Sequence, residues 1–263
     1  MPETSFLQGR TAIVTGAGSG IGSAIATTLA KEGAHLLVQD LNLTAVQDVA
    51  ATISRNGGSA TAIGGDVSNL DDVRAVTNAL LESHGRVDIL VNNAGLQHVA
   101  PIDDYPLDRW KKLLDVLLTG PFLFTQTVLP SMRQQKWGRI INLSSINGKR
   151  GDRGKAAYCS AKHGVIGLTR TVALETAADG ITVNAICPGY VDTPLLQRQL
   201  VSLAEINGIA EEDVLSQLIL PNIPQRRLMD TSEIAALVLF LVSEGAKGIT
   251  GQAIDISAGV QMQ

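Results

Sequence analysis

The sequence predicts a doubly wound α/β fold, in which a parallel sheet of seven strands lies between two layers of helices. Two observations predict it. Short runs of β-branched or leucine residues alternate with longer segments of helical period, and this order is stable as a parallel sheet covered on both faces. Strands such as ILV within 87–93 and RIINL within 138–145 lack polar alternation, which is typical of strands buried on both faces. We therefore expect a three-layer, Rossmann-like architecture.

The expected elements follow one another without a low-complexity linker or a repeat. Strands are expected at 11–15, 35–40, 59–65, 87–93, 138–145, 181–186 and 252–256. Helices are expected at 21–31, 43–56, 70–84, 107–134, 156–178 and 232–243. A length of 263 residues is compatible with one large α/β domain. We expect a single domain over 1–263.

Residues 194–227 interrupt this alternation. Two short amphipathic stretches, 195–206 and 211–219, stand where a strand should lead directly into the last helix. An insertion beyond a strand end is typical of a lid over a ligand site. The alternative is a surface pair of helices that packs only on its own domain.

The composition excludes several classes of protein. A content of 45% hydrophobic and 17% charged residues argues against a disordered or fibrous chain. The net charge of −4 and the lack of long like-charge runs predict no nucleic-acid partner. The longest strictly apolar run, 234–242, is too short to span a bilayer.

The N-terminal segment and the cysteines indicate where the protein works. The first ten residues lack the basic and apolar regions of a secretion signal. Cys159, Cys187 and the four histidines lack metal-ligand spacing. We expect a cytoplasmic protein without a structural metal.

A glycine-rich turn, TGAGSGIG at 15–22, follows the first strand directly. Its glycines allow a tight turn that brings backbone N–H groups and the N-terminus of the next helix up to a pyrophosphate. Its place between a strand and a helix strengthens the signal. The turn predicts a dinucleotide site, whose residues are Gly16, Ser19, Gly20, Ile21 and Gly22.

An acidic residue, Asp40, ends the second strand about twenty residues after the turn. Its carboxylate can accept hydrogen bonds from both hydroxyls of an adenosine ribose and would repel a 2′-phosphate. The adjoining Leu41, which we place in the same site, and Asn42 offer no arginine to hold such a phosphate. We therefore expect NAD rather than NADP. A helix cap or a strand-end turn is the alternative role of Asp40.

Two further strand ends belong to the same predicted site. Asp66 and Val67, after the third strand, provide a polar and an apolar contact for adenine. The fourth strand leads into Asn93, Ala94 and Gly95, where small residues allow the cofactor to cross the carboxyl edge of the sheet.

The candidate catalytic residues lie at and after the end of the fifth expected strand, whose last residue is Ser145. Tyr158 and Lys162 stand at i and i+4 of the next helix, so both side chains project from one face. A tyrosine, with an ordinary pKa of about 10, acts as a base near neutrality only where positive charge favours the phenolate. Lys162 and a nicotinamide would supply that charge, and Ser145 could hydrogen-bond the reacting oxygen. Taken alone, a YxxxK pattern is more typical of a solvated helix face.

Together these motifs resemble the short-chain dehydrogenase/reductase family over nearly the whole chain. The resemblance rests on TGAGSGIG at 15–22, Asp40, Asp66-Val67, NNAG at 92–95, Ser145, YCSAK at 158–162 and CPGYVDTP at 187–194. It implies that Tyr158 is the general acid and base, that Lys162 lowers the pKa of Tyr158 and binds the nicotinamide ribose, and that Ser145 positions the substrate oxygen. It further implies a homotetramer, and a nicotinamide and phosphate site lined by Pro188, Gly189, Val191 and Thr193.

One position departs from the family pattern. The segment that usually reads NLTGPF begins here with Leu117, which cannot provide the polar contact of the asparagine. In the family this asparagine helps to hold a water for proton exchange beside the lysine. Either another group holds the water here or turnover is slowed. Leu117 is the feature that favours an alternative reading as a catalytically weak, cofactor-binding paralogue, against which the intact Ser145, Tyr158 and Lys162 argue.

Within the family the sequence is most similar to bacterial NAD-dependent 3-hydroxybutyrate dehydrogenases. The shared segments include NNAGLQH at 92–98, GKAAY at 154–158 and TPLLQRQ at 193–199. The positions that hold the substrate carboxylate in those enzymes fall on Gln97, Asn147, Lys155 and Gln199, and Asn147 replaces a histidine. The resemblance implies a small anionic substrate, with 3-hydroxybutyrate or a related hydroxy acid leading. Asn147 favours an acidic or sulfonated sugar as the alternative, because an amide pairs readily with extra hydroxyls.

The loop GKRGDRGK at 148–155 carries four cations just before Tyr158. An anionic substrate would be attracted to them, and arginine can hold a carboxylate, phosphate or sulfonate through two parallel hydrogen bonds. We therefore count Arg150 with Lys155 among the substrate-binding candidates. For the cations other than Lys155, contact with solvent or with a neighbouring subunit is the alternative.

Overall fold

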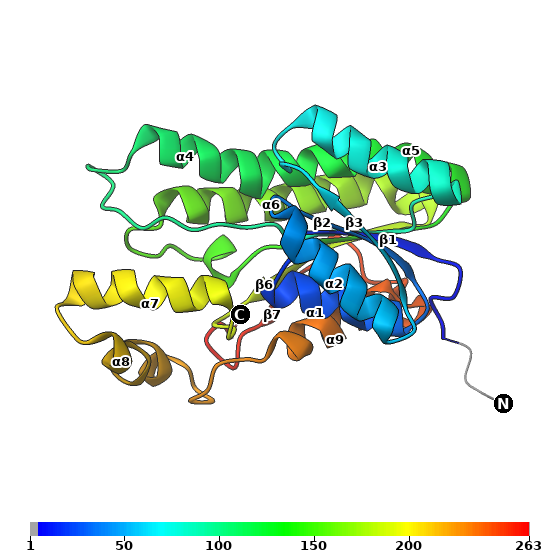
Figure 1. The fold of residues 1–263 in the computed structure, drawn as a ribbon. Coiled ribbons are helices and arrows are strands. Elements are labelled where there is room, and N and C mark those ends of the chain that lie inside the picture. The colour runs from blue at the N-terminus through cyan, green and yellow to red at the C-terminus, as the bar shows by residue number, and fades with distance from the viewer. Residues whose placement is uncertain (1–4, 263) are drawn as a thin grey trace.

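The computed structural model describes residues 5–262, apart from the side chains at 202 and 206. Within this part of the chain seven strands form one parallel sheet in the order β3-β2-β1-β4-β5-β6-β7, which confirms the predicted fold (Figure 1). The strands are β1 (Thr11–Thr15), β2 (His35–Asp40), β3 (Ser59–Gly64), β4 (Ile89–Asn92), β5 (Gly138–Leu143), β6 (Ile181–Pro188) and β7 (Ala253–Ile256).

Two layers of helices cover the sheet, and a separate pair of helices lies at one end of the molecule (Figure 1). One layer holds α3 (Leu70–His84), α4 (Leu107–Leu114), α5 (Gly120–Gln135) and α6 (Ala156–Thr176). The other holds α1 (Gly20–Lys31), α2 (Leu43–Arg55) and α9 (Thr231–Val242). The separate pair is α7 (Pro194–Asn207) and α8 (Glu211–Val214), within the segment that interrupts the sequence pattern.

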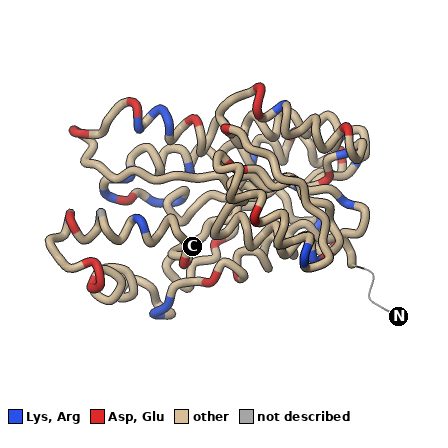
Figure 2. Tube along the Cα trace, viewed as in Figure 1, with Lys and Arg blue, Asp and Glu red and all other residues tan. Residues whose placement is uncertain are grey.

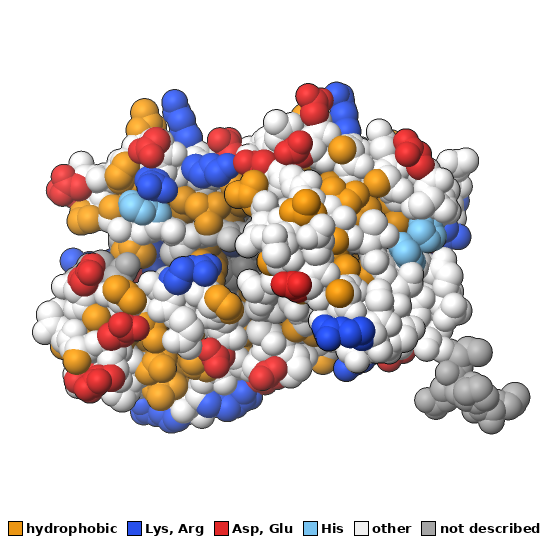
Figure 3. All heavy atoms as spheres, in the orientation of Figure 1, with side chains coloured by type: hydrophobic (Ala, Val, Ile, Leu, Met, Phe, Trp, Pro, Cys, Tyr) orange, Lys and Arg blue, Asp and Glu red, His pale blue; other side chains and the backbone are white. Residues whose placement is uncertain are grey.

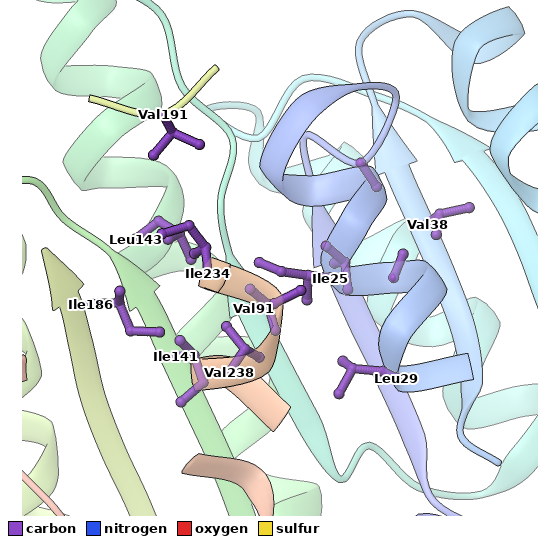
Figure 4. Close-up of a cluster of buried hydrophobic side chains, with 14 of the residues drawn as sticks. Ile25, Leu29, Val38, Val91, Ile141, Leu143, Ile186, Val191, Ile234 and Val238 are labelled. Carbon is purple, nitrogen blue, oxygen red and sulfur yellow. The ribbon is translucent and has the colours of Figure 1, made fainter. Parts of the chain in front are cut away.

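The burial of the strands explains their apolar sequences. Every residue of β1, β4, β5 and β6 is buried, whereas the edge strands β3 and β7 are partly exposed. Figure 4 shows the core between the sheet and the layer of α1 and α9, where Ile25, Val91, Ile141 and Val238 converge. Each such side chain contributes about 1.5–3 kcal/mol when it is fully buried. This packed core holds the sheet rigid and so fixes the positions of the residues at the strand ends.

The strand order reverses between β1 and β4, the point at which doubly wound sheets bind ligands. After β1 the chain turns into α1 on one face, and after β4 it leads towards α4 on the other. The carboxyl ends of these strands therefore border a crevice.

The long helix expected at 107–134 contains an irregularity. A π-helical turn, Asp115–Thr119, joins α4 to α5, and it contains Leu117. A second π-helical turn, Leu215–Ile219, follows α8. Apolar spacing reports that a segment is helical, but one extra residue in one turn leaves little trace in that spacing.

Two strand ends also differ from expectation. The strand β5 ends at Leu143, and Ser145 caps a short 3₁₀ turn, Ile146–Gly148, by accepting a hydrogen bond from the Asn147 N–H at 3.1 Å. The strand β6 continues beyond 186 because Cys187 and Pro188 pair with β7.

The helical stretch Leu107–Gln135 is the one in residues 5–262 that is long and apolar enough to cross a membrane. It packs in the layer on the sheet, where Phe124, Val128 and Met132 are buried in the core. A core helix passes the same test of length and composition, so this is weak evidence for a membrane span.

Candidate active site

A cavity of about 340 Å³ opens at the carboxyl ends of the strands and is bounded on its other side by α7. Figure 3 shows the hollow at this end of the molecule, between the part around α4 and the part formed by α7 and α8. Most of the site residues predicted from the sequence line this cavity. They are Gly16, Ser19, Gly20, Ile21, Asp40, Asn93, Gly95, Gln97, Ser145, Asn147, Lys155, Tyr158, Lys162, Pro188, Gly189, Val191, Thr193 and Gln199.

Three predicted cofactor residues support the glycine turn or lie outside the cavity. A Cβ atom at Gly22 would collide with the Gly16 carbonyl oxygen, so Gly22 allows the helix to pack closely on the turn. The Ala94 N–H donates to the Thr15 hydroxyl at 3.1 Å. Leu41 is 74% exposed and does not line the cavity.

The predicted adenine pair also lies outside the cavity lining. Val67 is buried in the core and faces Gly120, where an added Cβ atom would lie 3.1 Å from its side chain. Asp66 pairs with Lys112, whose Nζ lies 2.8 Å from Oδ2. Burial opposes ionisation, but hydrogen bonds from Lys112 and Ser68 outweigh it and lower the pKa of Asp66 to about 2. Asp66 is therefore ionised and paired with Lys112.

The N-terminus of α1 is open to an anion. Ser19 is the N-cap but its side chain accepts no hydrogen bond from the helix, and the first turn carries no acidic residue. The first backbone N–H groups are thus left without an intrahelical acceptor and face the cavity with the positive end of the helix dipole. Gly16 has φ +62°, and a Cβ atom there would lie 2.6 Å from Ala94 Cα. This glycine cradle and helix end fit a pyrophosphate.

Hydrogen bonds from neighbouring residues hold the turn in place. The Asn93 side-chain amide donates to the carbonyl oxygens of Thr15 at 2.9 Å and Gly16 at 3.0 Å. The Asp40 carboxylate accepts from the Gly18 N–H at 3.1 Å and from the Asn42 N–H at 3.0 Å. Asp40 therefore does serve as a strand-end turn residue, and it lines the cavity as well.

Tyr158 and Lys162 reach the cavity from the first turns of α6. Lys162 is only 5% exposed, its Nζ donates to the Leu143 carbonyl oxygen, and it lies 5.6 Å from the centre of the Tyr158 ring. The Ser144 hydroxyl donates to the Lys162 carbonyl oxygen at 3.0 Å, which fixes the helix against the end of β5. Sequence reasoning did not single out Ser144.

The titration of this pair differs from the sequence expectation. Burial raises the pKa of Tyr158 to about 12, although hydrogen bonding with Ser145 favours the phenolate. Burial also lowers the pKa of Lys162 to about 8. In the protein alone the lysine therefore loses its proton before the tyrosine does. Additional positive charge next to Tyr158 is needed before it can act as a base near neutrality.

The surroundings of Leu117 are apolar. Leu117 is 1% exposed and packs with Leu113, Ala157 and Ala161, and Tyr158 packs against the same cluster. Alkyl groups therefore occupy the place where the family pattern has a polar amide.

An acid that sequence reasoning did not select, Asp152, contacts two residues of the cavity lining without being part of that lining. Asp152 Oδ2 accepts from Lys155 Nζ at 2.7 Å and from Asn147 Nδ2 at 3.2 Å. Asn147 is 6% exposed, and its Oδ1 is buried with no hydrogen-bond partner among the residues that the structure describes. The signal that could have found Asp152 is its position three residues before Lys155.

The cations of the 148–155 loop point in different directions. Lys149 Nζ donates to Asp255 Oδ2 and to the Ala253 carbonyl oxygen, both at 2.7 Å, and so ties the loop to β7. Arg150 and Arg153 are exposed and do not line the cavity, whereas Lys155 does. For Arg150 the alternative of contact with solvent or a neighbour thus describes its position better than substrate contact.

A different arginine lines the cavity from the opposite side. Arg198 and Gln199, next to one another on α7, both belong to the lining. Figure 2 shows basic positions on the loop before α6 and on α7, at the same end of the molecule. Tyr190 lines the cavity as well and was not predicted. The sequence signal for Arg198 was its place beside Gln199 in TPLLQRQ. In the described part of the chain no group of three or more metal-ligating side chains gathers.

Comparisons with known proteins agree with this geometry. A family model described as short chain dehydrogenase matches residues 10–201. An uncharacterized oxidoreductase, YxjF of Bacillus subtilis (strain 168), is 49% identical over 96% of this chain and 98% of its own length. The D-beta-hydroxybutyrate dehydrogenase of Cupriavidus necator is 40% identical over 97% of this chain and 98% of its own.

A solved structure adds a third relative. It is described as an NAD(P)-dependent gluconate 5-dehydrogenase from Beutenbergia cavernae with NADP bound, and it superposes with a TM-score of 0.87 at 36% identity, covering 98% of each chain. The family model and these sequence identities show the family to which the chain belongs. The chain belongs to the short-chain dehydrogenase/reductase family of NAD(P)-binding oxidoreductases, which act on CH–OH groups.

Proposed function

We propose that the protein is an NAD-dependent dehydrogenase that interconverts a secondary alcohol and a ketone on a small anionic hydroxy acid. The observation that carries this proposal is the convergence of Ser145, Tyr158 and Lys162 on one cavity with the open N-terminus of α1. Tyrosine, serine and lysine together can hold a carbinol oxygen and move its proton.

The preference for NAD over NADP rests on Asp40. Its carboxylate lines the cavity and is suited to two ribose hydroxyls, and it would repel a 2′-phosphate. The Beutenbergia cavernae relative binds NADP, so the preference is a property proposed for this chain's own residues. Gly16, Gly20 and the first turn of α1 would hold the pyrophosphate. When bound, the nicotinamide supplies the acceptor for hydride from the carbinol carbon.

In the proposed mechanism Ser145 donates a hydrogen bond that positions the reacting oxygen, and Tyr158 takes its proton. Lys162, as an ammonium, stabilises the phenolate and orients the ribose of the cofactor. Because burial raises the pKa of Tyr158 to about 12 even with Lys162 nearby, the positive charge of a bound nicotinamide would have to add to that of Lys162 to favour the base form. Leu117 leaves the apolar side of Tyr158 without a proton carrier, so the proton leaves on the cavity side.

Among hydroxy acids, 3-hydroxybutyrate is the leading candidate. The 40% identical Cupriavidus necator enzyme supports it, and Gln97, Lys155 and Gln199 retain residue types that hold its carboxylate in similar enzymes. Arg198 supports an anionic substrate further, because it adds a cation from α7 to the same cavity. We propose that residues 194–227 act as the lid, within a single catalytic domain.

An acidic or sulfonated sugar is the second candidate. Asn147 favours it, since a side-chain amide can pair with an additional hydroxyl, and the likeness to a gluconate 5-dehydrogenase agrees. A catalytically weak paralogue would be favoured by Leu117 alone.

We also propose a cytoplasmic location and a homotetrameric assembly. The free thiols of Cys159 and Cys187 suit a reducing cytoplasm. A homotetramer is supported by large apolar side chains exposed on α5 and α6, where Phe122 is 45% and Leu174 is 85% exposed.

NADH formation at 340 nm tests the proposal, with NAD or NADP against hydroxy acids, acidic and sulfonated sugars, and neutral polyols. Tyr158→Phe should reduce turnover by about 10²-fold or more while NAD binding, followed by fluorescence, is kept. Tyr105→Phe is the matched control, because Tyr105 donates to the His98 carbonyl oxygen and does not line the cavity. Substantial activity in Tyr158→Phe would refute the assignment.

A further inference from the structure

Arg198 belongs to the face of α7 that borders the cavity. Leu195, Arg198 and Gln199 stand at i, i+3 and i+4, so they project from one side of the helix, and all three line the cavity. Leu196 and Leu200 are buried in the core, which fixes the rotation of α7 about its axis. Arg198 itself is exposed, and Figure 3 shows basic side-chain atoms in the hollow between α4 and α7. Arg198 therefore stands at the open edge of the cavity, within reach of a ligand.

The charge of Arg198 is not offset within the chain. The residues three and four positions away along α7 are Pro194, Leu195, Val201 and Ser202, so none offers a carboxylate for an ion pair within the helix. Among the side chains that the structure describes, no ion pair includes Arg198. The guanidinium thus keeps its donors and its full charge for a ligand.

The other cations of the lining are already engaged. Lys155 Nζ lies 2.7 Å from Asp152 Oδ2, and the two side chains are only 12% and 32% exposed. Water and salt screen such a partly buried pair weakly, so Asp152 offsets much of the charge that Lys155 would present to a substrate. Lys162 is buried beside Tyr158, where the proposed mechanism uses its charge. Arg198 is therefore the cation of the lining that is left for an anionic group.

We propose that Arg198 is a specificity-determining residue, which makes the enzyme prefer anionic over neutral alcohols by holding the substrate carboxylate from α7. A guanidinium can hold a carboxylate through two parallel hydrogen bonds. Gln97 and Gln199 add hydrogen bonds but little discrimination, because amides pair with neutral groups as well. Lys155 contributes less than Arg198, because Asp152 competes with the substrate for it. This inference rests on the proposed dehydrogenase function and assigns the residue that selects its substrate class.

The experiment compares two substrates that differ in charge but hardly in shape. The kcat/KM for NADH formation is measured with 3-hydroxybutyrate and with its neutral amide, 3-hydroxybutyramide, each as both enantiomers. The ratio of the two values is the charge preference. Arg198→Gln should lower this preference about tenfold or more, since a charge-assisted double hydrogen bond is lost. The loss should appear as a higher KM for the acid, with little change in the values for the amide.

Two further variants control this result. Arg198→Lys keeps the charge without the paired donors, so it should retain part of the preference. Arg226→Gln removes an exposed arginine of the 194–227 segment that does not line the cavity, and it should leave the preference unchanged. An unchanged preference in Arg198→Gln, or an equal loss in Arg226→Gln, would overturn the inference.

Asp152→Asn tests the division of roles between the two cations. This substitution removes the competing charge and frees Lys155, so the charge preference should rise. Arg198→Gln should then cost less in the Asp152→Asn background than in the unmodified enzyme, which a double-mutant cycle measures. A fall of the preference in Asp152→Asn would show that Lys155 binds the anion with the help of Asp152, and would overturn the leading role of Arg198.

The failure of this inference is distinguishable from the failure of the proposed function. Turnover that depends on Tyr158 but keeps its charge preference in Arg198→Gln would refute the inference alone. If no hydroxy acid is oxidised, the proposed function fails. The inference is then decided by calorimetry of butyrate and butyramide binding to the protein with NAD: a preference for butyrate that Arg198→Gln removes would support it, and equal binding of the two would refute it.

Discussion

Replacing Lys162 with methionine should make the protein more stable and nearly inactive. Lys162 is 5% exposed, and burial lowers its pKa from 10.5 to about 8. At about 1.4 kcal/mol per pH unit, this difference means that the charged lysine costs the folded state roughly 3 kcal/mol near neutrality. Methionine fills a similar volume without charge, but it loses the hydrogen bond to the Leu143 carbonyl oxygen, worth about 1 kcal/mol. The expected net gain is about 2 kcal/mol.

The gain should depend on pH in a defined direction. Below pH 8 the lysine is charged in both the folded and the unfolded chain, so the full cost is present. As pH rises from about 8 towards 10.5, the folded protein loses the proton first and the cost fades. The stability advantage of Lys162→Met should therefore be largest at pH 7 and absent near pH 10.5.

Urea unfolding at fixed protein concentration, without cofactor, measures this difference at pH 7 and pH 10. For a chain of this size the gain corresponds to about 4–8 °C in Tm. Lys31→Met, at an exposed position, is the control and should stay within about 0.5 kcal/mol of the unmodified protein. A less stable Lys162→Met at pH 7, or an equal gain at both pH values, would show that the buried charge is not the destabilising group.

Two further substitutions test other parts of the molecule. Asp40→Ala should raise the ratio of kcat/KM with NADP to that with NAD about tenfold or more, since a repelling carboxylate is removed; an unchanged ratio would place the 2′-position elsewhere. Asp88 is fully buried and accepts hydrogen bonds from Arg10, Thr11 and Arg86, so Asp88→Ala should cost about 3 kcal/mol in urea unfolding. Because Asp88 precedes β4 at the amino end of the sheet, kcat at 25 °C should hardly change, and a large fall in kcat would contradict this separation.

The fold was predictable because buried parallel strands need short apolar runs and the covering helices need apolar residues at helical spacing. Most expected boundaries lie within one or two residues of the observed ones, as for β2 at His35–Asp40 and α3 at Leu70–His84. The π-helical turn Asp115–Thr119 was not predictable, because packing decides where an extra residue enters a helix. Leu117 was noticed in the sequence for its type, and the structure adds the apolar cluster that surrounds it.

The candidate site was predictable where backbone chemistry determines it. Glycines of the first turn and the residues that follow each strand line the cavity, because strand ends meet at one edge of a parallel sheet. Contacts between charged side chains were less predictable. Arg150 was selected from the sequence and Arg198 was not, because the paths of the loop and of α7, which place Arg198 in the cavity lining, are not visible in the sequence. The catalytic roles of Ser145, Tyr158 and Lys162 stay predictions until the variants are measured.

The anchoring of the loop before α6 has a consequence for how such an enzyme diversifies. Lys149 secures its first part to β7, and the Gly154 carbonyl oxygen secures its last part by accepting from the Ala100 N–H at 2.9 Å. Between these anchors, residues 150–153 can be exchanged without moving the tyrosine and lysine of α6. None of residues 150–153 lines the cavity, so exchanges in this segment reach it only through Asp152, whose carboxylate accepts from the side chains of Asn147 and Lys155.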